Sequence, residues 1–164
     1  MRRQKAKNHT GSRRIAREFA FRILFQSKQS KTSIADTLDH ATAMMRSEDD
    51  TYAQLTQEAL DFSKTLLKEY VDRQDAIDMT LRRGIRGWSF EQMAQTDLNI
   101  IRLALCEMVF TETPAPPIIE SAVRIARKFG GEESGRFVNG VLASLFKSKT
   151  EGTLDLSAEP LEEE

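Results

Sequence analysis

Cysteine, histidine and proline are scarce in this chain of 164 residues. There are one cysteine, Cys106, two histidines, His9 and His40, and four prolines. A single cysteine cannot form a disulfide within the chain, which predicts a protein of the reducing cytoplasm. Two histidines and one cysteine at these spacings do not make a zinc site. Cys106 lies in the most apolar segment, which is typical of a buried structural cysteine rather than a nucleophile.

Phosphate-binding loops and long apolar runs are missing as well. Gly84, Gly87 and the pair Gly130-Gly131 follow neither the dinucleotide-binding nor the P-loop spacing. No apolar run approaches the roughly 18–20 residues that span a membrane. The N-terminus also lacks the apolar core of a secretory signal. We therefore expect no cofactor and no membrane association, and the residues give no support for catalysis.

The formal net charge of −1 conceals a strong segregation of charge. Seven lysines and arginines and no acidic residue occur in Met1–Arg17. Six acidic residues and a single lysine occur in Ser148–Glu164. A basic head and an acidic tail indicate a polyanionic partner at the N-terminal end alone, and two solvated tails are the alternative. We predict a flexible basic arm over residues 1–11, a helical domain over 12–147 and a disordered acidic tail over 148–164.

The segments between the glycines and prolines have the period of helices, with no strand-like alternation of useful length. The predicted fold class is therefore all-α, with about seven helices in one domain. They are expected at residues 12–28, 33–46, 51–83, in a short turn after Ser89, at 98–110, in a segment ending at Phe129, and at 132–147. Ser12 is the expected N-cap of the first helix, and the third is expected to bend or break near Asp72–Asp75. The helix 98–110 is apolar on nearly all sides, which predicts a central position.

The stretch KFGGEESGRFVNGVL, from Lys128 to Leu142, carries an asparagine and a glycine inside an apolar helix. Because glycine costs up to about 1 kcal/mol in a helix interior, Gly140 predicts the close approach of another helix. Asn139 lies beside the apolar face and is expected to hydrogen-bond a neighbouring loop or helix end. Both residues are thus predicted to be structural. Arg136 points outward in the same helix and either binds phosphate or is simply solvated.

The same stretch resembles the C-terminal signature FG-x-E-(D/E)-S-x-(K/R)-FVNGVL of the NusB family of bacterial transcription antitermination factors. RRIAREFAFRILFQ, from Arg13 to Gln26, is similar to the N-terminal helix of that family. DLNIIRLALCEM, from Asp97 to Met108, is similar to its central helix. The resemblance covers about Arg13 to Phe146, although residues 32–65 match in helical character alone.

This resemblance implies an all-α fold of two packed three-helix bundles. It implies a non-catalytic factor that binds the boxA element of ribosomal RNA leader transcripts together with NusE, the ribosomal small-subunit protein that doubles as an elongation factor. In the family this complex joins other Nus factors on RNA polymerase and suppresses termination. Some family members are monomers and others are homodimers.

The resemblance also implies which residues bind. The NusE interface involves the start of the central helix, here Asp97. The aromatic residue late in the first helix is usually tyrosine, so Phe25 keeps the stacking face and lacks the hydroxyl. The acidic tail extends beyond the usual end of the family, and we expect it to compete with RNA for the basic head. The RNA contacts carried over are Arg2, Arg3, Arg13, Arg14, Arg17, Phe25, Phe129, Glu133, Arg136 and Phe137.

Two other functions fit the same residues less well. A related helical domain forms the N-terminal part of a ribosomal RNA cytosine methyltransferase, but that activity requires a catalytic domain with a cofactor loop and catalytic cysteines. This sequence contains neither feature. The second of these alternatives is a helical module that binds protein alone, and the basic head argues against it.

Overall fold

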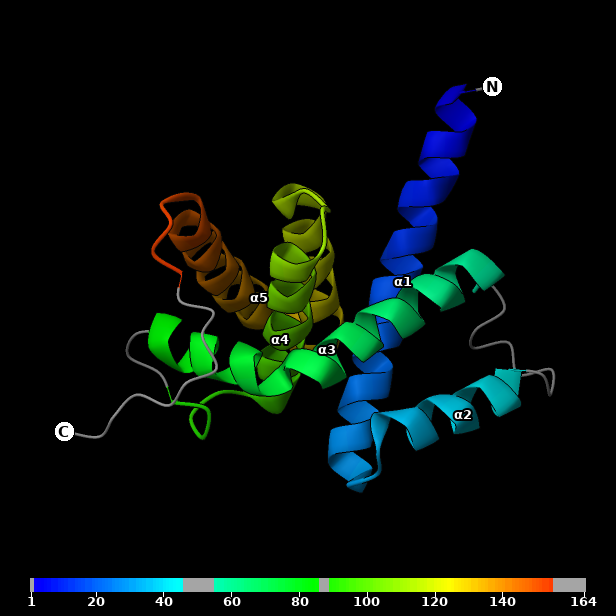
Figure 1. The fold of residues 1–164 in the computed structure, drawn as a ribbon, viewed down its shortest axis with the longest axis horizontal. Helices are drawn as coiled ribbons and strands as arrows, with labels where there is room; N and C mark the ends of the chain where they lie inside the picture. The colour runs from blue at the N-terminus through cyan, green and yellow to red at the C-terminus, as the bar shows by residue number, and fades with distance from the viewer. Residues whose placement is uncertain (1, 46–54, 86–88, 155–164) are drawn as a thin grey trace. The chain divides into compact units, whose positions relative to one another are not determined.

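The structure is a computed structural model that describes residues 2–45, 55–85 and 89–154, with side chains from Ser12 onward. Helices are the only regular secondary structure within these ranges (Figure 1). The chain divides into two compact units, Met1–Lys68 and Glu69–Glu164, which we treat separately. None of the described helices combines the length and the hydropathy that a membrane crossing requires.

The first unit contains α1 (Arg2–Ser30), α2 (Ile34–Met45) and the first part of α3 (Gln57–Gly84). Local side-chain caps set the helix starts: the Ser33 hydroxyl accepts the Asp36 amide at 3.1 Å, and the Thr56 hydroxyl accepts the Ala59 amide at 3.1 Å. Ser63 donates to the carbonyl of Ala16 at 2.8 Å, which joins α3 to α1. The buried stripe of α1 has helical spacing and consists of Ala16, Phe19, Ala20, Ile23 and Leu24.

The second unit contains the rest of α3, α4 (Gln95–Phe110) and α5 (Ala115–Thr150). Every residue of α4 from Asp97 to Met108 is buried, which confirms the predicted central helix. Cys106 is fully buried, which confirms the predicted buried cysteine, and burial raises the pKa of its thiol to about 12. At the far end of α4, the ammonium of Lys149 donates to the carbonyl of Met108 at 2.8 Å.

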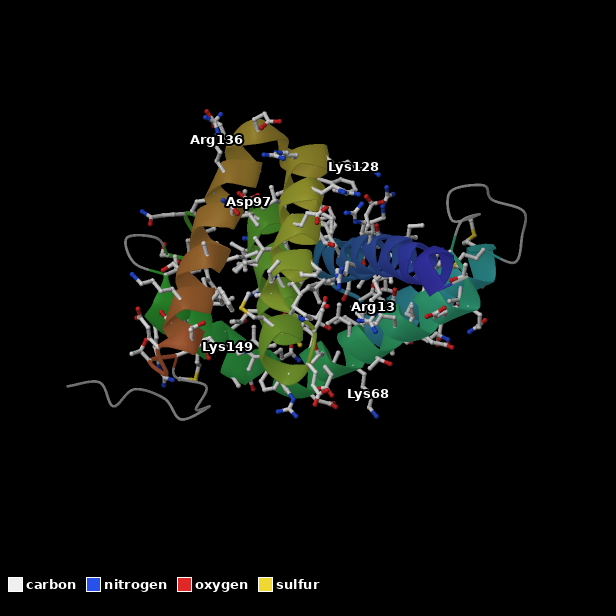
Figure 2. The ribbon with its side chains drawn as sticks, turned by 90° about the horizontal axis from the view of Figure 1, so that it is seen from above. Arg13, Lys68, Asp97, Lys128, Arg136 and Lys149 are labelled. Carbon is white, nitrogen blue, oxygen red and sulfur yellow. The ribbon has the colours of Figure 1, made fainter. Side chains whose placement is uncertain are left out.

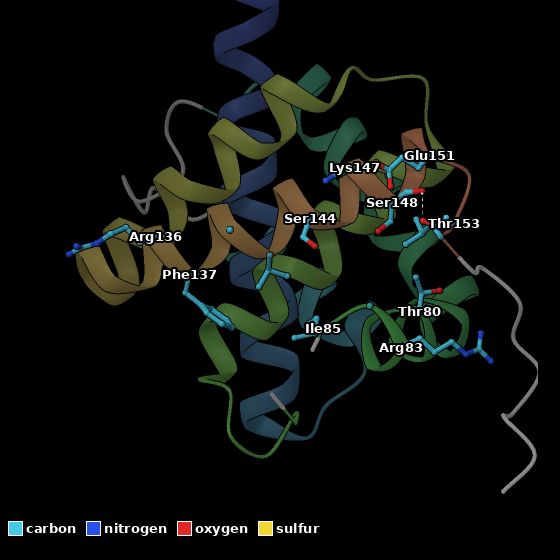
Figure 3. A pocket seen from close by; sticks show the side chains of 14 residues that line it. Thr80, Arg83, Ile85, Arg136, Phe137, Ser144, Lys147, Ser148, Glu151 and Thr153 are labelled. Carbon is cyan, nitrogen blue, oxygen red and sulfur yellow. Dashed lines mark hydrogen bonds between the residues drawn. The ribbon is translucent and has the colours of Figure 1, made fainter. Parts of the chain in front are cut away.

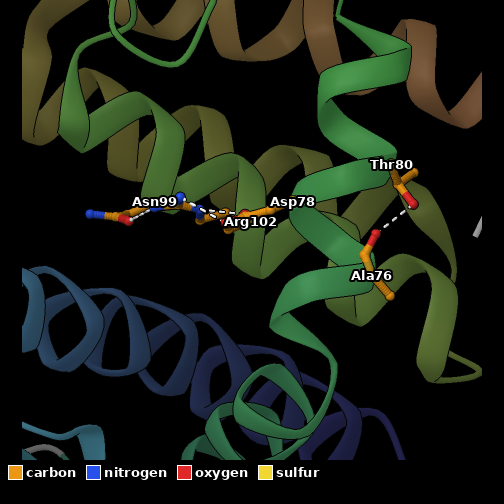
Figure 4. Close-up of polar contacts among 5 residues, drawn as sticks. All are labelled: Ala76, Asp78, Thr80, Asn99 and Arg102. Atoms are coloured by element: carbon orange, nitrogen blue, oxygen red, sulfur yellow. Dashed lines mark hydrogen bonds and ion pairs between the residues drawn. The ribbon is translucent and has the colours of Figure 1, made fainter. Parts of the chain in front are cut away.

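A buried polar network ties α4 to α3 within this unit (Figure 4). The guanidinium of Arg102 donates from Nε to Oδ1 of Asp78 at 2.8 Å and from Nη2 to Oδ2 at 3.0 Å. Its Nη1 donates to Oδ1 of Asn99 at 3.0 Å. Since the Arg102 side chain is only 9% exposed, these bonds are needed to compensate for the water that the charge has lost.

The described residues form five helices, so the prediction of about seven is wrong in number. The segment after Ser89 makes turns rather than a helix, and α3 runs through Asp72–Asp75 without a break. The two predicted C-terminal helices form a single element, α5, with one non-helical residue, Gly131 at φ 85°. The expected break is therefore at the predicted place, but one glycine turns the chain and no loop follows.

The first helix also starts earlier than predicted, at Arg2 rather than after a cap at Ser12. Residues 2–11 contain no proline and several good helix formers, so nothing in this segment stops the helix before Gly11. The serine that we took for a cap instead lies inside α1, where its hydroxyl is 3.3 Å from that of Thr56.

Candidate nucleic-acid interface

Two adjacent glycines, Gly130 and Gly131, determine the course of the chain in the middle of α5. Gly131 has φ 85° and ψ −175°, a backbone conformation that side chains with a Cβ rarely adopt. Gly130 has a helical backbone, but a Cβ at this position would collide with the side chain of Ser134. The first glycine of the pair therefore provides space, and the second provides the kink that redirects the helix toward Glu132 and the residues after it.

The kink displays the predicted RNA-binding side chains of the second unit. Phe129, just before it, is 40% exposed, which is unusual for a large aromatic side chain. Glu133 and Arg136 follow it on exposed positions, and Phe137 is half-buried. Arg136 points outward from α5 (Figure 2), and no described residue forms an ion pair with it.

Lys128 belongs to this surface, although the sequence analysis did not select it. Its ammonium lies 5.6 Å from the centroid of the Phe129 ring. A cation beside an exposed ring is suited to a nucleotide, because the ring can stack on a base while the charge attracts the phosphate. Its position next to Phe129 in the sequence is the signal by which it could have been selected.

Asp97, the predicted NusE contact, lies at the start of α4 and is only 7% exposed. Its carboxylate accepts a hydrogen bond from the side chain of Ser134 in α5, and burial raises its pKa. The other oxygen, Oδ1, has no hydrogen-bond partner among the described residues. Asp97 therefore holds the start of α4 against the turn that follows the kink, and a role in partner binding stays a prediction.

The predicted RNA-binding arginines of α1 divide into half-buried and buried members. The guanidinium of Arg13 lies 5.0 Å from the ring centroid of Phe62 in α3, and that of Arg17 lies 5.7 Å from it. Arg17 is only 7% exposed, so its position favours packing against this ring rather than direct contact with RNA. Arg13 and Arg14 are half-buried. Phe62 was missed because its place in an apolar helical pattern made it look like an ordinary core residue.

The remaining α1 candidates are Phe25 and the two N-terminal arginines. Phe25 is half-buried, and its ring centroid lies 5.9 Å from that of Phe21 at an interplanar angle of 38°. This tilted pair fixes the orientation of the Phe25 ring. Arg2 and Arg3 lie in the first turn of α1, and their side chains are outside the described part of the structure.

Asn139 and Gly140 do not have the structural roles that we predicted. Both are exposed, and a Cβ on Gly140 would meet no atom within 4 Å. The buried stripe of α5 passes through Gly135, Val138 and Leu142, so residues 139 and 140 face away from it. The closely packed glycine is Gly135 instead, where a Cβ would lie 2.7 Å from Cγ of Arg127.

A family model described as the NusB family matches residues 14–147. The transcription antitermination protein NusB of Deinococcus deserti is 54% identical over 147 residues, which are 90% of this chain and 88% of that protein. The chain belongs to the NusB family. NusB of Thermus thermophilus is 43% identical over 143 residues, 87% of this chain and 95% of that protein.

A solved structure of the antitermination factors NusB and NusE in complex with double-stranded RNA has the same fold. It aligns with a TM-score of 0.72 over 84% of this chain and 97% of that chain. At 21% sequence identity the likeness bears on the fold alone. In the present NusB-family chain, the arginines of α1 and the side chains around the α5 kink belong to different units.

Proposed function

We propose that this protein is a transcription antitermination factor that binds the boxA element of ribosomal RNA leader transcripts together with NusE and catalyses no reaction. Identity of 54% with an antitermination protein over 90% of the chain supports this function. The structural observation that carries it is the set of side chains around the Gly131 kink. There an exposed ring, Phe129, lies beside the cation of Lys128, and Arg136 points outward from α5 beyond the kink.

Each member of this set has a distinct chemical task toward single-stranded RNA. Phe129 stacks on an unpaired base, which contributes about 1–3 kcal/mol in such interfaces. Lys128 and Arg136 contact phosphates and make the affinity depend on salt. Glu133 is a hydrogen-bond acceptor for the amino group of a base. In the first unit, Arg13 and Arg14 add phosphate contacts, Phe25 adds a second ring, and Arg2 and Arg3 extend the basic surface.

The partner surface is assigned to the start of α4. Asp97 marks this position, with NusE as the partner, and in the assembled complex the protein joins other Nus factors and RNA polymerase in the cytoplasm. The three helical segments in each unit support an arrangement of two three-helix bundles. The basic residues before Ser12 belong to the first turns of α1, and the acidic segment follows the end of α5 at Thr150. A homodimer that covers the RNA surface is the alternative to a monomer.

The experiment is a titration of fluorescently labelled boxA RNA with the protein, followed by anisotropy. A scrambled RNA of equal length is the control, and each titration is made with and without NusE at low and high salt. We expect tighter binding of boxA than of the scrambled RNA, further tightening by NusE, and weakening by salt. Binding that is indifferent to RNA sequence and to NusE would contradict the proposal and favour a module that binds protein alone.

A further inference from the structure

A groove runs between the C-terminal end of α3 and the last turns of α5. Its volume is about 750 Å³. In Figure 3, Ser144, Lys147 and Ser148 come from α5, and Thr80, Arg83 and Ile85 come from the end of α3. Phe137 and Arg136 lie at the far end along α5. The side chains of this groove come from one unit, so its geometry is set within that unit.

The groove combines positive charge with apolar surface. Arg83, Arg136 and Lys147 line it against one acidic residue, Glu151. The ammonium of Lys147 and the guanidinium of Arg136 form no ion pair with any described residue. Apolar lining is provided by Ile85, Phe137 and Val141. A complementary occupant is therefore an extended segment that carries both carboxylates and aliphatic side chains.

The end of α5 directs the chain toward this groove. Gly152 has φ 72°, its amide donates to the carbonyl of Lys149 at 3.1 Å, and the amide of Thr153 donates to the carbonyl of Ser148 at 2.9 Å. These two bonds are the helix-terminating pattern in which a left-handed glycine reverses the chain. As a consequence, Thr153 and Leu154 line the groove instead of continuing along the helix axis.

The sequence that follows Leu154 has the composition that the groove requires. Asp155–Glu164 contains five acidic residues, no basic residue, and the two leucines Leu156 and Leu161. Ten extended residues reach about 33 Å. The helical distance from Lys147 back to Arg136 is about 16 Å at 1.5 Å per residue. The segment is thus long enough to cover the groove from its start at Leu154 to Arg136.

We propose that Asp155–Glu164 docks in the groove between α3 and α5, with its carboxylates toward Lys147, Arg83 and Arg136 and its leucines on the apolar lining. Because the segment starts inside the groove, it binds at a high effective concentration and excludes weaker ligands from solution. From the sequence alone we expected the acidic tail to bind the basic head. The structure leads us to propose the groove as its binding site instead.

A consequence for regulation rests on the proposed function. Arg136 and Phe137 belong both to this groove and to the predicted RNA surface. A docked tail therefore competes with RNA for these two side chains. RNA that binds tightly displaces the tail, whereas RNA of unrelated sequence does not, and the tail increases discrimination between them.

The first test needs no RNA. A nitroxide is attached to Ser157→Cys in the full chain, where the native Cys106 is fully buried and does not compete for the label. We expect the label to broaden the amide signals of Gly140 and Ser144 at low salt and to lose this effect at high salt, since the docking is partly electrostatic. Lys147→Glu is expected to abolish the broadening, and Lys64→Glu, on an exposed position of the first unit, is the matched control.

Three outcomes would overturn the proposal. Gly140 and Ser144 signals that stay sharp at low salt would show that the segment does not occupy the groove. Broadening that arises only when unlabelled ¹⁵N protein is mixed with labelled ¹⁴N protein would assign the groove to a second copy. If added RNA shifts the amide signals of the groove residues while the nitroxide does not broaden them, the groove is an RNA-binding site and not the docking site of the segment.

The second test separates the tail from the proposed RNA function. Its variant neutralises all five acidic residues of Asp155–Glu164, as Asp155→Asn with Glu159→Gln, Glu162→Gln, Glu163→Gln and Glu164→Gln. We expect a several-fold gain in affinity for scrambled RNA and a smaller gain for boxA. Equal gains for both would refute the competition and leave the docking to the label experiment. If the wild type does not prefer boxA, the proposed function fails while the label experiment still decides the docking.

Discussion

The carboxylate of Asp97 at the start of α4 accepts a hydrogen bond from the side chain of Ser134 in α5. Ser134 in turn lies over Gly130, where any Cβ would collide with it. One polar contact thus links the predicted partner surface to the predicted RNA surface across the kink. A substitution at Asp97 can therefore alter the position of Ser134 at the kink, and a substitution at Ser134 can alter the start of α4.

Removal of the charge on Asp97 should stabilise the protein at neutral pH. Burial raises the pKa of this carboxyl in the folded state. A folded-state pKa above the unfolded value contributes stability that is present at low pH and lost as the pH rises through the folded value. Asp97→Asn avoids this loss, because an amide is neutral at every pH and can still accept the bond from Ser134.

Urea unfolding at neutral pH and at about pH 4 measures this effect, since the unfolded carboxyl titrates near the lower value. We expect Asp97→Asn to exceed the wild type in stability at neutral pH and to lose this advantage in acid. Asp72→Asn, on an exposed position of α3, is the control and should change neither value. A destabilised Asp97→Asn at neutral pH would show that the ionised form is needed for the contact.

Loss of Asp78 should destabilise the second unit strongly. Asp78→Ala leaves Arg102 with Asn99 as its remaining hydrogen-bond partner in the network, on a side chain that is 9% exposed. Because Asp78 is itself 27% exposed, we expect a loss of about 2–3 kcal/mol rather than the full cost of a buried unpaired charge. Urea unfolding measures the loss, and Asp75→Ala, exposed on the same helix, should cost far less. Equal losses would mean that Arg102 finds water or another acceptor.

The pairing of Arg13 with Phe62 should matter for RNA. Phe62→Leu removes the aromatic face that holds two guanidinium groups, a contribution of about 0.5–1 kcal/mol each at such sites. We expect a modest loss of stability and a several-fold loss of boxA affinity, because Arg13 is no longer positioned. Phe62→Trp keeps the face and should recover most of the affinity. If Phe62→Leu and Phe62→Trp bind RNA equally, the ring has no role in positioning Arg13.

Arg136 should affect binding and leave stability unchanged. It is exposed, and no described residue forms an ion pair with it. Arg136→Ala is expected to weaken boxA binding by about 1–3 kcal/mol and to leave the melting temperature in place. Asn139→Ala is the matched control, since Asn139 is exposed on the same helix and surface substitutions usually change stability by less than about 0.5 kcal/mol. Similar losses of boxA affinity in both variants would show that any substitution on this face of α5 weakens binding, and that the Arg136 side chain has no specific contact with RNA.

Local signals in the sequence located most features that depend on neighbours along the chain. The helix predicted at 33–46 corresponds to α2 (Ile34–Met45), the apolar pattern predicted the burial of α4, and the glycine pair predicted the break in α5 at Gly131. Features that depend on distant neighbours were not predictable in this way. The burial of Arg17 follows from the position of Phe62, which is 45 residues further along the chain.

The face of the last part of α5 shows why the sequence misled us. Apolar residues occur on more than one side of it, and Phe146 is 38% exposed. With the phase of the helix ambiguous, the glycine inside the apolar run looked like the packed one. Gly135 is the buried glycine, and its neighbour Arg127 is a long polar side chain that gives no apolar signal.

Alanine at these two glycines should therefore have opposite effects. At Gly140 a Cβ meets nothing within 4 Å, so alanine gains helix propensity, and we expect stabilisation of up to about 1 kcal/mol. At Gly135 a Cβ would lie 2.7 Å from Cγ and 3.5 Å from Cδ of Arg127. The arginine side chain must move, which offsets the same gain in propensity, so Gly135→Ala should be neutral or destabilising.

Thermal or urea unfolding of the two variants gives the answer directly, and the double substitution Gly135→Ala with Arg127→Ala serves as the control. Truncation of Arg127 removes the atoms that a Cβ would meet, so the alanine at position 135 should then stabilise relative to Arg127→Ala alone. A gain at both glycines in the wild-type background would show that Arg127 moves aside at little cost. A loss at Gly140 would show that something covers this face in solution, and the acidic segment in the groove would be the first candidate, since Gly140 lines it.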